Sequence, residues 1–413
     1  MRHNRHYTIS LARLAMVGLL ALLGSGWQTS RAQPPPVLEP QPLLPAPAES
    51  ASLSLAAAPP SLPNRYLEVE YLLWGLDNVT LPRLLTSNPV GTPLASVGQS
   101  SDPSTQTVVG DEVVGDWPQA GMRFRAGQLM ESGPFSRMEL SGFFLFDRSD
   151  DWHMESETGD PILARPFTDA DGQSDAQILS LAGVADGSLH AHYKRRFYGI
   201  EPLAFFCVEG NGCRATEFFT GYRYMRYEDQ ITITERVRPE AGGLIAPGTE
   251  FLVEDIFRAT NDYHVLPLGL SYTGIRNAWR LDARALLALG LVHQRVTVRG
   301  RTQVSVLDDV ESESSGGFLA LPPDLGTHDQ TEFAWIPELN VTLRRCLRGG
   351  LWMHVGYTIM HLNDVVQAPA QISGEIDPAA LPPPTSAPEN ARFVAHSSDA
   401  WVHGLNVGIQ WNY

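Results

Sequence analysis

The sequence predicts an all-β fold, a closed antiparallel transmembrane β-barrel of about ten strands, with twelve strands as the alternative. Segments of about ten to fifteen residues alternate apolar and polar side chains, which is the pattern of a strand with one apolar and one polar face. The connections alternate between short and long, as the periplasmic turns and external loops of outer-membrane barrels do. After residue 32 the longest apolar run, residues 285–292, is less than half of the ~20 residues that a membrane-spanning helix needs.

The first segment, RYLEVEYLLW (65–74), sets four apolar side chains on one parity against Glu68 and Glu70 on the other. The last, GLNVGIQWNY (404–413), places Trp411 and Tyr413 on its apolar parity. Arginine occurs on both parities of 194–206 and 216–229, so the pattern does not decide which parity faces inward. Pro267 blurs the alternation in 256–274. The other segments that we expect to form strands are 120–129, 137–146, 279–291, 331–345 and 351–360.

The connections between these segments support the barrel. The short ones are 131–135, 208–213, 274–278 and 347–350, and the long ones cover about 76–117, 148–189, 230–255, 300–329 and 362–398. An even strand count places both chain ends on the periplasmic side. Residues 105–114 and 230–237 are strand-like, and we expect them to extend strands outside the membrane or to raise the strand count to twelve.

The N-terminal region reads as an export signal followed by a linker. Arg2, Arg5 and Arg13 precede and flank an apolar stretch, 14–24, and Ser30-Arg31-Ala32 supplies small residues for signal peptidase. Residues 33–64 carry ten prolines and two charges, a composition that cannot build a core. We therefore expect a cleaved signal peptide at 1–32, a disordered linker at 33–64, and an outer-membrane barrel at 65–413 of a bacterial cell envelope protein.

The charge balance bears on the partners of the chain. The chain has 30 basic and 46 acidic residues, a formal net charge of −16, whereas nucleic-acid binding needs a basic face. We expect outer-membrane lipid and the outer-membrane assembly machinery as partners, small solutes as further candidates, and no nucleic acid. The oligomeric state stays open.

Several stretches resemble one family of barrel proteins, found chiefly in planctomycete-type bacteria. They include YLLW and LPRLLTS (71–74, 81–87), RRFYGIE (195–201), GYRYMRYED (221–229), FAWIPELNVTL (333–343) and HVGYTIMHLNDVVQAP (354–369). In their order and spacing, residues 65–413 are similar to the Putative beta barrel porin-7 family. The resemblance implies an exported outer-membrane β-barrel without established catalytic residues or substrate. Tyr263-His264-Val265 departs from the aromatic-x-Gly that the resemblance implies after 255–262.

Charged side chains on the polar parity of the segments are the candidate lining of the barrel interior. They are Glu68, Glu70, Arg123, Arg125, Arg137, Glu139, Arg280, Asp282, Arg284, Glu332 and Glu338. Ten strands enclose a narrow interior. If opposite charges pair there, the barrel is plugged and structural; if they segregate, it is a channel for passive diffusion of small solutes.

Three functional hypotheses follow. The first is a porin-like or structural surface protein, and its alternative is an adhesion or ligand-binding protein that uses long external loops on a plugged barrel anchor. A less favoured third is an outer-membrane hydrolase built on serine and histidine at the rim. The sequence holds no G-x-S-x-G, H-E-x-x-H, P-loop or dinucleotide motif, so we expect no enzyme and no cofactor.

The C-terminal aromatics Trp411 and Tyr413 are expected to act as the signal that the assembly machinery recognises. Cys207 and Cys213 are close enough in sequence to form a disulfide in an exported chain. His190 and His192 share a strand face and the residue type of metal ligands, but the sequence identifies no third ligand, and we expect no metal. Residues 168–176 resemble a Ca²⁺ loop only superficially, since the glycine and bidentate glutamate of an EF-hand are missing.

Overall fold

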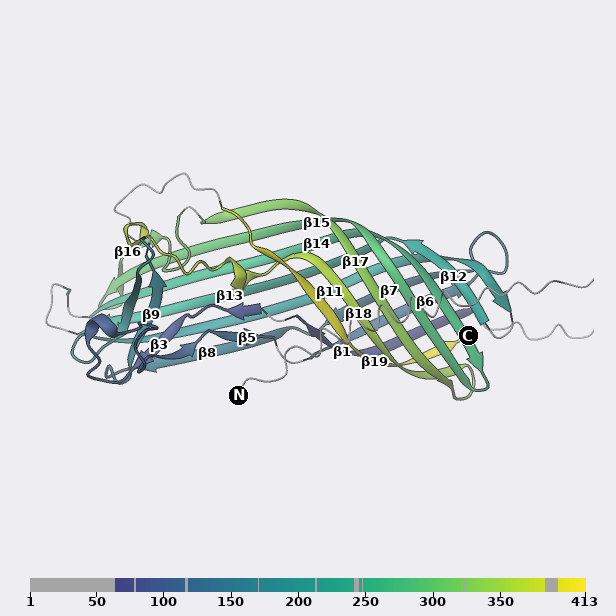
Figure 1. The fold of residues 1–413 in the computed structure, drawn as a ribbon, viewed down its shortest axis with the longest axis horizontal. Helices are drawn as coiled ribbons and strands as arrows, with labels where there is room; N and C mark the ends of the chain where they lie inside the picture. The colour runs from purple at the N-terminus through teal and green to yellow at the C-terminus, as the bar shows by residue number, and fades with distance from the viewer. Residues whose placement is uncertain are drawn as a thin grey trace, which may run out of the picture. The chain divides into compact units, whose positions relative to one another are not determined.

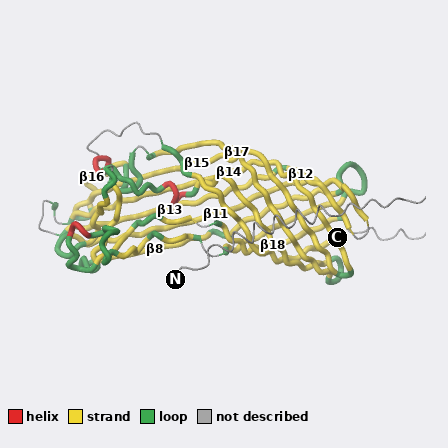
Figure 2. The backbone as a smooth tube through the Cα atoms, viewed as in Figure 1, coloured by secondary structure: helices red, strands yellow, loops and turns green. Residues whose placement is uncertain are grey.

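A computed structural model describes residues 64–77, 79–115, 118–169, 171–211, 214–240, 245–246, 248–322, 324–382 and 393–413. All of them belong to one compact unit, Pro60–Tyr413. The predicted signal peptide, 1–32, and all but the last residue of the predicted linker, 33–64, lie outside these ranges. The described residues form nineteen strands and three short 3-10 turns (Figures 1 and 2). No helix among them is long and apolar enough to cross a membrane.

Ten strand positions pair into an antiparallel ring, with β12 and β13 sharing one position between β11 and β14. In ring order they are β1 (Arg65–Leu76), β6 (Gln119–Leu129), β7 (Arg137–Leu145), β11 (Ala185–Asn211), β12 (Arg214–Gly221) with β13 (Arg223–Pro239), β14 (Thr249–Arg276), β15 (Trp279–Val306), β17 (Gly326–Cys346), β18 (Leu351–Val366) and β19 (Ser397–Asn412). Each of the ten predicted segments lies in one position of this ring.

The last strand meets the first. β19 pairs with β1 from Tyr66↔Asn412 to Leu76↔Val402, and the Tyr413 N–H donates to the Arg65 carbonyl at 2.9 Å. The four short connections fall between β6 and β7, β11 and β12, β14 and β15, and β17 and β18, as the sequence predicts. The departure at Tyr263-His264-Val265 does not interrupt β14.

The outer face of the ring carries an apolar belt. Along β1 the exposed side chains are Leu67, Val69, Tyr71 and Leu73, whereas Glu68 and Glu70 between them are buried. The same arrangement continues around the ring, with exposed residues that include Phe124, Leu140, Ile200, Leu268, Leu281, Phe333, Val355 and Val407. The apolar side chains of the predicted segments therefore face outward and the charged ones face inward.

Several ring strands run far beyond the belt. β11, β14 and β15 have 27, 28 and 28 residues, whereas a tilted membrane strand needs ~9–11. On β14 the outward residues are Leu266, Leu268 and Leu270 within the belt, but Arg258 and Asp262 beyond it. The inward residues show the opposite change: beyond the belt they include large buried aromatics, Phe257 and Tyr263. The alternation in 256–274 is blurred because the apolar side chains change from the inner face to the outer face at His264. Pro267 is not the cause.

The part beyond the belt, here called the extension, comprises 185–197, 225–239, 249–263, 293–306 and 326–331 with the segments packed on them. β8 (Arg148–Ser156) pairs with β11, and β16 (Asp309–Ser315) pairs with β15. β10 (Ser174–Ser180), β9 (Ile162–Thr168), β3 (Leu85–Asn88) and β4 (Gln106–Val109) form a small separate sheet, and β2 (Val79–Leu81) pairs with β5 (Glu112–Val114). The 3-10 turns are Leu94–Ser96, Ala368–Gln371 and Pro378–Ala380.

These extra strands come from the regions predicted as long loops, which is a correction to that prediction. Leu85, Leu163 and Leu179 pack in one buried cluster with inward residues of the extension such as Ile231 and Phe257. Residues 230–237 extend β13, as expected, and 106–109 and 112–114 form β4 and β5. Figure 1 shows β3, β9 and β16 at one end of the unit and the C-terminus at the other. The long connections therefore fold into an ordered extension with its own core.

Candidate functional site: a charged layer inside the ring

A layer of paired charges lies inside the ring on the side of the short turns. Inward parity places Glu68 and Glu70 on β1 opposite Arg125 and Arg123 on β6 in the strand register. All four side chains are at most 6% exposed. Arg125 donates to Glu68, and an Arg123 Nη1 lies 3.4 Å from Glu70 Oε2. Opposite charges on directly facing strand positions stabilise the pairing of those strands.

Other pairs cross the interior. Arg284 on β15 donates to Glu139 on β7 through both terminal nitrogens, at 2.7 and 2.8 Å. Tyr66 also donates to Glu139. β7 and β15 are separated by three strand positions one way around the ring and by five the other way. A bidentate arginine–carboxylate pair therefore connects opposite walls, a geometry that fixes direction as well as distance.

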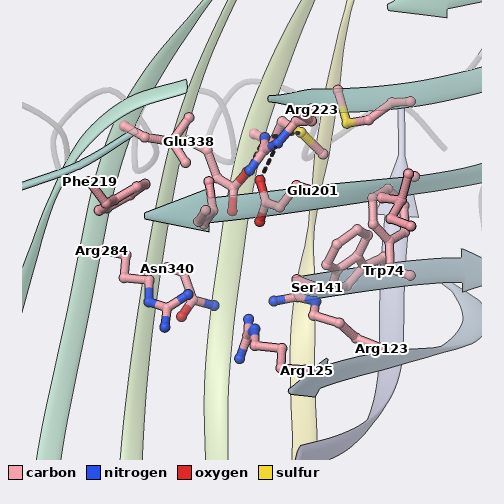
Figure 3. Close-up of a pocket in the computed structure, with 17 residues that line it drawn as sticks. Trp74, Arg123, Arg125, Ser141, Glu201, Phe219, Arg223, Arg284, Glu338 and Asn340 are labelled. Atoms are coloured by element: carbon pink, nitrogen blue, oxygen red, sulfur yellow. Dashed lines mark hydrogen bonds and ion pairs between the residues drawn. The ribbon is translucent and has the colours of Figure 1, made fainter. Parts of the chain in front are cut away.

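Two further arginines join three strands each. Arg344 on β17 donates to Asp282 at 2.6 Å and to Glu68 at 2.8 Å. Arg223 on β13 donates to Glu201 at 2.6 Å and to Glu338 at 2.7 Å, and Figure 3 shows it between these carboxylates. With the remaining pairs, the charged layer comprises Glu68, Glu70, Arg123, Arg125, Arg137, Glu139, Glu201, Glu217, Arg223, Arg280, Asp282, Arg284, Glu338, Arg344 and His354.

The charges of this layer balance, because its seven arginines face seven carboxylates. The cavity at its centre measures about 30 Å³ and is lined by Arg123, Arg125, Arg223, Arg284 and Trp74 among others (Figure 3). A water molecule needs ~10–15 Å³ of such space, so this cavity holds about two. This cavity has no room for a dissolved solute, whereas a second cavity of about 200 Å³ lies on the turn side of the layer and is lined by Glu68, Arg137, Glu217, Arg280, Asp282 and Arg344.

An apolar layer blocks the interior again on the side of the extension. Every strand position of the ring except β6 contributes to it, and no member is more than 6% exposed. Its members are Leu72, Trp74, Leu76, Leu145, Phe197, Met225, Tyr227, Tyr263, Val265, Ala288, Val292, Ala334, Ile336, Met360, Leu362, Val365, Ala400 and Val402. The expectation of a polar interior holds for the turn side but not for this layer, because the next inward residues after Glu70 and Glu338 are Leu72 and Ile336.

Of the predicted lining residues, ten join the charged layer. Glu332 does not: it is exposed, and its facing partner on β15 is Val292, a member of the apolar layer. Glu201 and Arg223 were not predicted, because arginine on both parities of their segments left open which side chains face inward. Tyr66, Arg344 and His354 were also missed. Tyr66 is on the same parity as Glu68, Arg344 is on the same parity as Glu338, and His354 is on the parity opposite to the apolar Met353 and Val355.

Three ligand-type atoms of the charged layer lie close together, those of Glu68, Glu70 and His354, within 4.8 Å of one another. Both carboxylates already pair with arginines, Glu68 with Arg125 and Arg344 and Glu70 with Arg123. A divalent cation would have to displace these guanidinium groups from a buried position. The arrangement therefore supports ion pairing rather than metal binding.

The predicted C-terminal aromatics and Cys207 lie at the turn side, whereas the acidic stretch 168–176 lies in the extension. Trp411 and Tyr413 are 51% and 45% exposed on the outer face, with ring centroids 4.9 Å apart. Cys207 is exposed, whereas Cys213 lies outside the described residues, so the disulfide stays a prediction. In the acidic stretch 168–176, Asp169 Oδ1 accepts from the N–H groups of Asp171 and Gln173, which makes a tight turn between β9 and β10.

Comparison with solved structures returns outer-membrane proteins at low similarity. The outer membrane protease OmpT from Escherichia coli is 7% identical with a TM-score of 0.38, over 87% of this chain and 100% of its own. The toluene transporter TodX from P. putida is 7% identical with a TM-score of 0.18, over 86% of this chain and 91% of its own. No curated protein matches the chain.

The sequence model of one family matches residues 66–413, almost the whole ring-forming part of the chain. This range begins inside β1 and ends after β19, so it covers every strand position of the ring. The chain thus belongs to the Putative beta barrel porin-7 family, as its sequence motifs indicated, and this supports an outer-membrane β-barrel.

Proposed function

We propose that the protein is a closed transmembrane β-barrel of the bacterial outer membrane whose interior is filled. The barrel acts as an anchor, and the extension that it carries is presented at the cell surface, where it is available to partners. The protein does not serve as an open diffusion channel.

The outer face supports the membrane location. An apolar belt surrounds the ring, and ring pairing gives each strand a hydrogen-bonded neighbour on both sides, which the bilayer interior demands. Beyond the belt the outward residues are ion pairs such as Arg226–Asp262 and Arg258–Glu228, which suit water. The short turns at the other end correspond to periplasmic turns.

The two layers support the filled interior, and the apolar layer is the observation that carries the proposal. Porins conduct because their interior is polar and filled with water. Here a buried apolar layer spans nearly the whole ring, and beside it every arginine of the charged layer is held by a carboxylate. A hydrated solute would have to disrupt both layers.

A flux measurement tests the proposal. Proteoliposomes with the purified full chain should swell in small sugars no faster than empty liposomes, while an open porin reconstituted in the same way swells. Swelling above the empty control would overturn the filled interior.

Labelling of intact cells tests the orientation. A membrane-impermeant maleimide should label Thr297→Cys in the extension and leave the wild-type chain, whose Cys207 and Cys346 lie near short turns, unlabelled until lysis and reduction. Thr297 is an outward residue of β15 and bonds to Thr327 there. Labelling of the wild type but not of Thr297→Cys on intact cells would contradict the proposed orientation.

A further inference from the structure

Four side chains with metal-binding chemistry form an array on the outer face of the extension. β11 carries His190 and His192, and β8 carries Asp151 and His153. In the strand register His190 faces His153 and His192 faces Asp151. Residues two apart on a strand share a face, so all four project to the same side. The neighbouring strand thus supplies the ligands that the sequence around His190 and His192 lacks.

Asp151 contacts both histidines of β11. Asp151 Oδ1 lies 2.7 Å from His192 Nδ1 and 3.3 Å from His190 Nε2. The rings of His153 and His190 have centroids 6.1 Å apart. Directly facing residues of antiparallel strands have Cβ atoms about 4.5–5.5 Å apart, which is within reach of one shared ion.

We propose that His153, His190, His192 and Asp151 bind one divalent transition-metal ion, of which Zn²⁺ is the first choice. Three imidazoles and one carboxylate match the nitrogen and oxygen ligands of tetrahedral zinc, and imidazole also suits copper and nickel. Each imidazole gives the lone pair of one nitrogen and keeps its proton on the other. The side chains are 37% to 60% exposed, so they can turn from their hydrogen bonds toward an ion.

The position of the array gives the ion a structural role. Among the described strands β8 pairs with β11 alone, so its other edge has no strand partner. An ion held by both strands cross-links this edge strand to the ring. The array differs from the Glu68, Glu70 and His354 group, because Asp151 pairs with His190 and His192, whereas Glu68 and Glu70 pair with arginines. The site depends on the pairing of β8 with β11 and not on the membrane location or the filled interior.

Titration calorimetry of the full chain, purified without a histidine tag, tests the site with ZnCl₂ in a non-chelating buffer. We expect one saturable zinc ion per chain, and at least a tenfold loss of affinity in each of His190→Ala and His192→Ala. His293→Ala is the matched control, because the His293 side chain is also 43% exposed and lies 3.7 Å from a single carboxylate, that of Asp329. Its zinc affinity should equal that of the wild type.

A second readout locates the ion. Zinc should slow amide hydrogen exchange across 148–156 in the wild type and in His293→Ala, but not in His190→Ala. Circular dichroism checks that each variant retains its strands, and exchange in β19 reports whether the ring is intact. Absence of saturable binding to the wild type would overturn the proposal. So would unchanged affinity in folded His190→Ala and His192→Ala, since the ion would then sit elsewhere.

Discussion

Arg284 on β15 holds Glu139 on β7 through two hydrogen bonds of 2.7 and 2.8 Å that cross the interior of the ring. Glu139 is buried and also pairs with Arg137, while Arg284 is 16% exposed. Such a pair gives little net stability against a well-packed apolar alternative, but it is costly to break from one side. The charged layer therefore holds opposite walls of the ring in one relative position.

Arg284→Ala should lower the free energy of unfolding by about 3–5 kcal/mol. The substitution leaves the buried Glu139 carboxylate with Arg137 as its remaining ion-pair partner. Urea unfolding in detergent micelles measures this change. Arg295→Ala is the control: it breaks the exposed pair with Asp329, which has the same 2.7 Å contact, and should cost clearly less because water screens this pair. Equal losses in the two variants would show that the crossing pair has no special role.

Phe197→Ala should destabilise the protein by about 3–5 kcal/mol, because Phe197 is fully buried in the apolar layer and contacts Phe143 at a ring distance of 5.0 Å. Tyr198→Ala changes the next residue, which faces outward and is 37% exposed, and should cost clearly less. The same unfolding measurement compares the two. A larger loss in Tyr198→Ala would mean that the facing of β11 is reversed.

Asp229 in the extension should make stability depend on pH. Burial raises the pKa of its carboxyl to about 7, although the Ala368 N–H and the Tyr193 hydroxyl donate to it at 2.9 and 3.2 Å. Its pKa in the unfolded chain is about 4, so between pH 4 and 7 the folded chain keeps a proton that the unfolded chain has lost. The free energy of unfolding should fall by up to about 4 kcal/mol as pH rises through this window.

Asp229→Asn removes the titrating group and keeps an oxygen for the Ala368 N–H. Its stability should therefore fall less than that of the wild type between pH 4 and 7, as measured by urea unfolding at each pH. Parallel pH profiles for the two proteins would contradict a raised pKa at this position.

Deletion of Trp411 to Tyr413 should impair assembly, because it removes the exposed C-terminal aromatics and the Tyr413 N–H bond to Arg65. Loss of the heat-modifiable form from the outer-membrane fraction is the expected result. Phe333→Ala, which removes an equally outward aromatic from the middle of the chain, should assemble normally. Normal assembly of the deletion variant would refute a role for the C-terminal aromatics.

Much of the ring could be predicted from the sequence. Where one parity of a segment is apolar and the other is polar, the alternation alone shows which side chains share a face of the sheet. Leu67 to Leu73 against Glu68 and Glu70 is such a case, and the charged layer on β1, β6 and β7 followed from it. Glu201 and Arg223 could not be assigned, because outward Arg196 and Arg226 beyond the belt are on the opposite parity of the same strands.

The extension escaped prediction for a related reason. Its strands face water outside and a core inside, so the parity of their apolar residues is the reverse of that in the belt. Phe257 and Tyr263 followed by Leu266 and Leu268 record this reversal on β14. The metal-binding array depends on the register of β8 with β11, which alternation along a single segment does not contain.

Single-channel recording in planar lipid bilayers tests the filled interior most directly. The wild-type chain, inserted in its heat-modifiable form, should give no conductance steps above the bare bilayer, under conditions in which an open porin conducts. The charged and apolar layers both lie across the path that an ion would take. Regular conductance steps from the wild-type protein would contradict the proposal that it is a filled anchor.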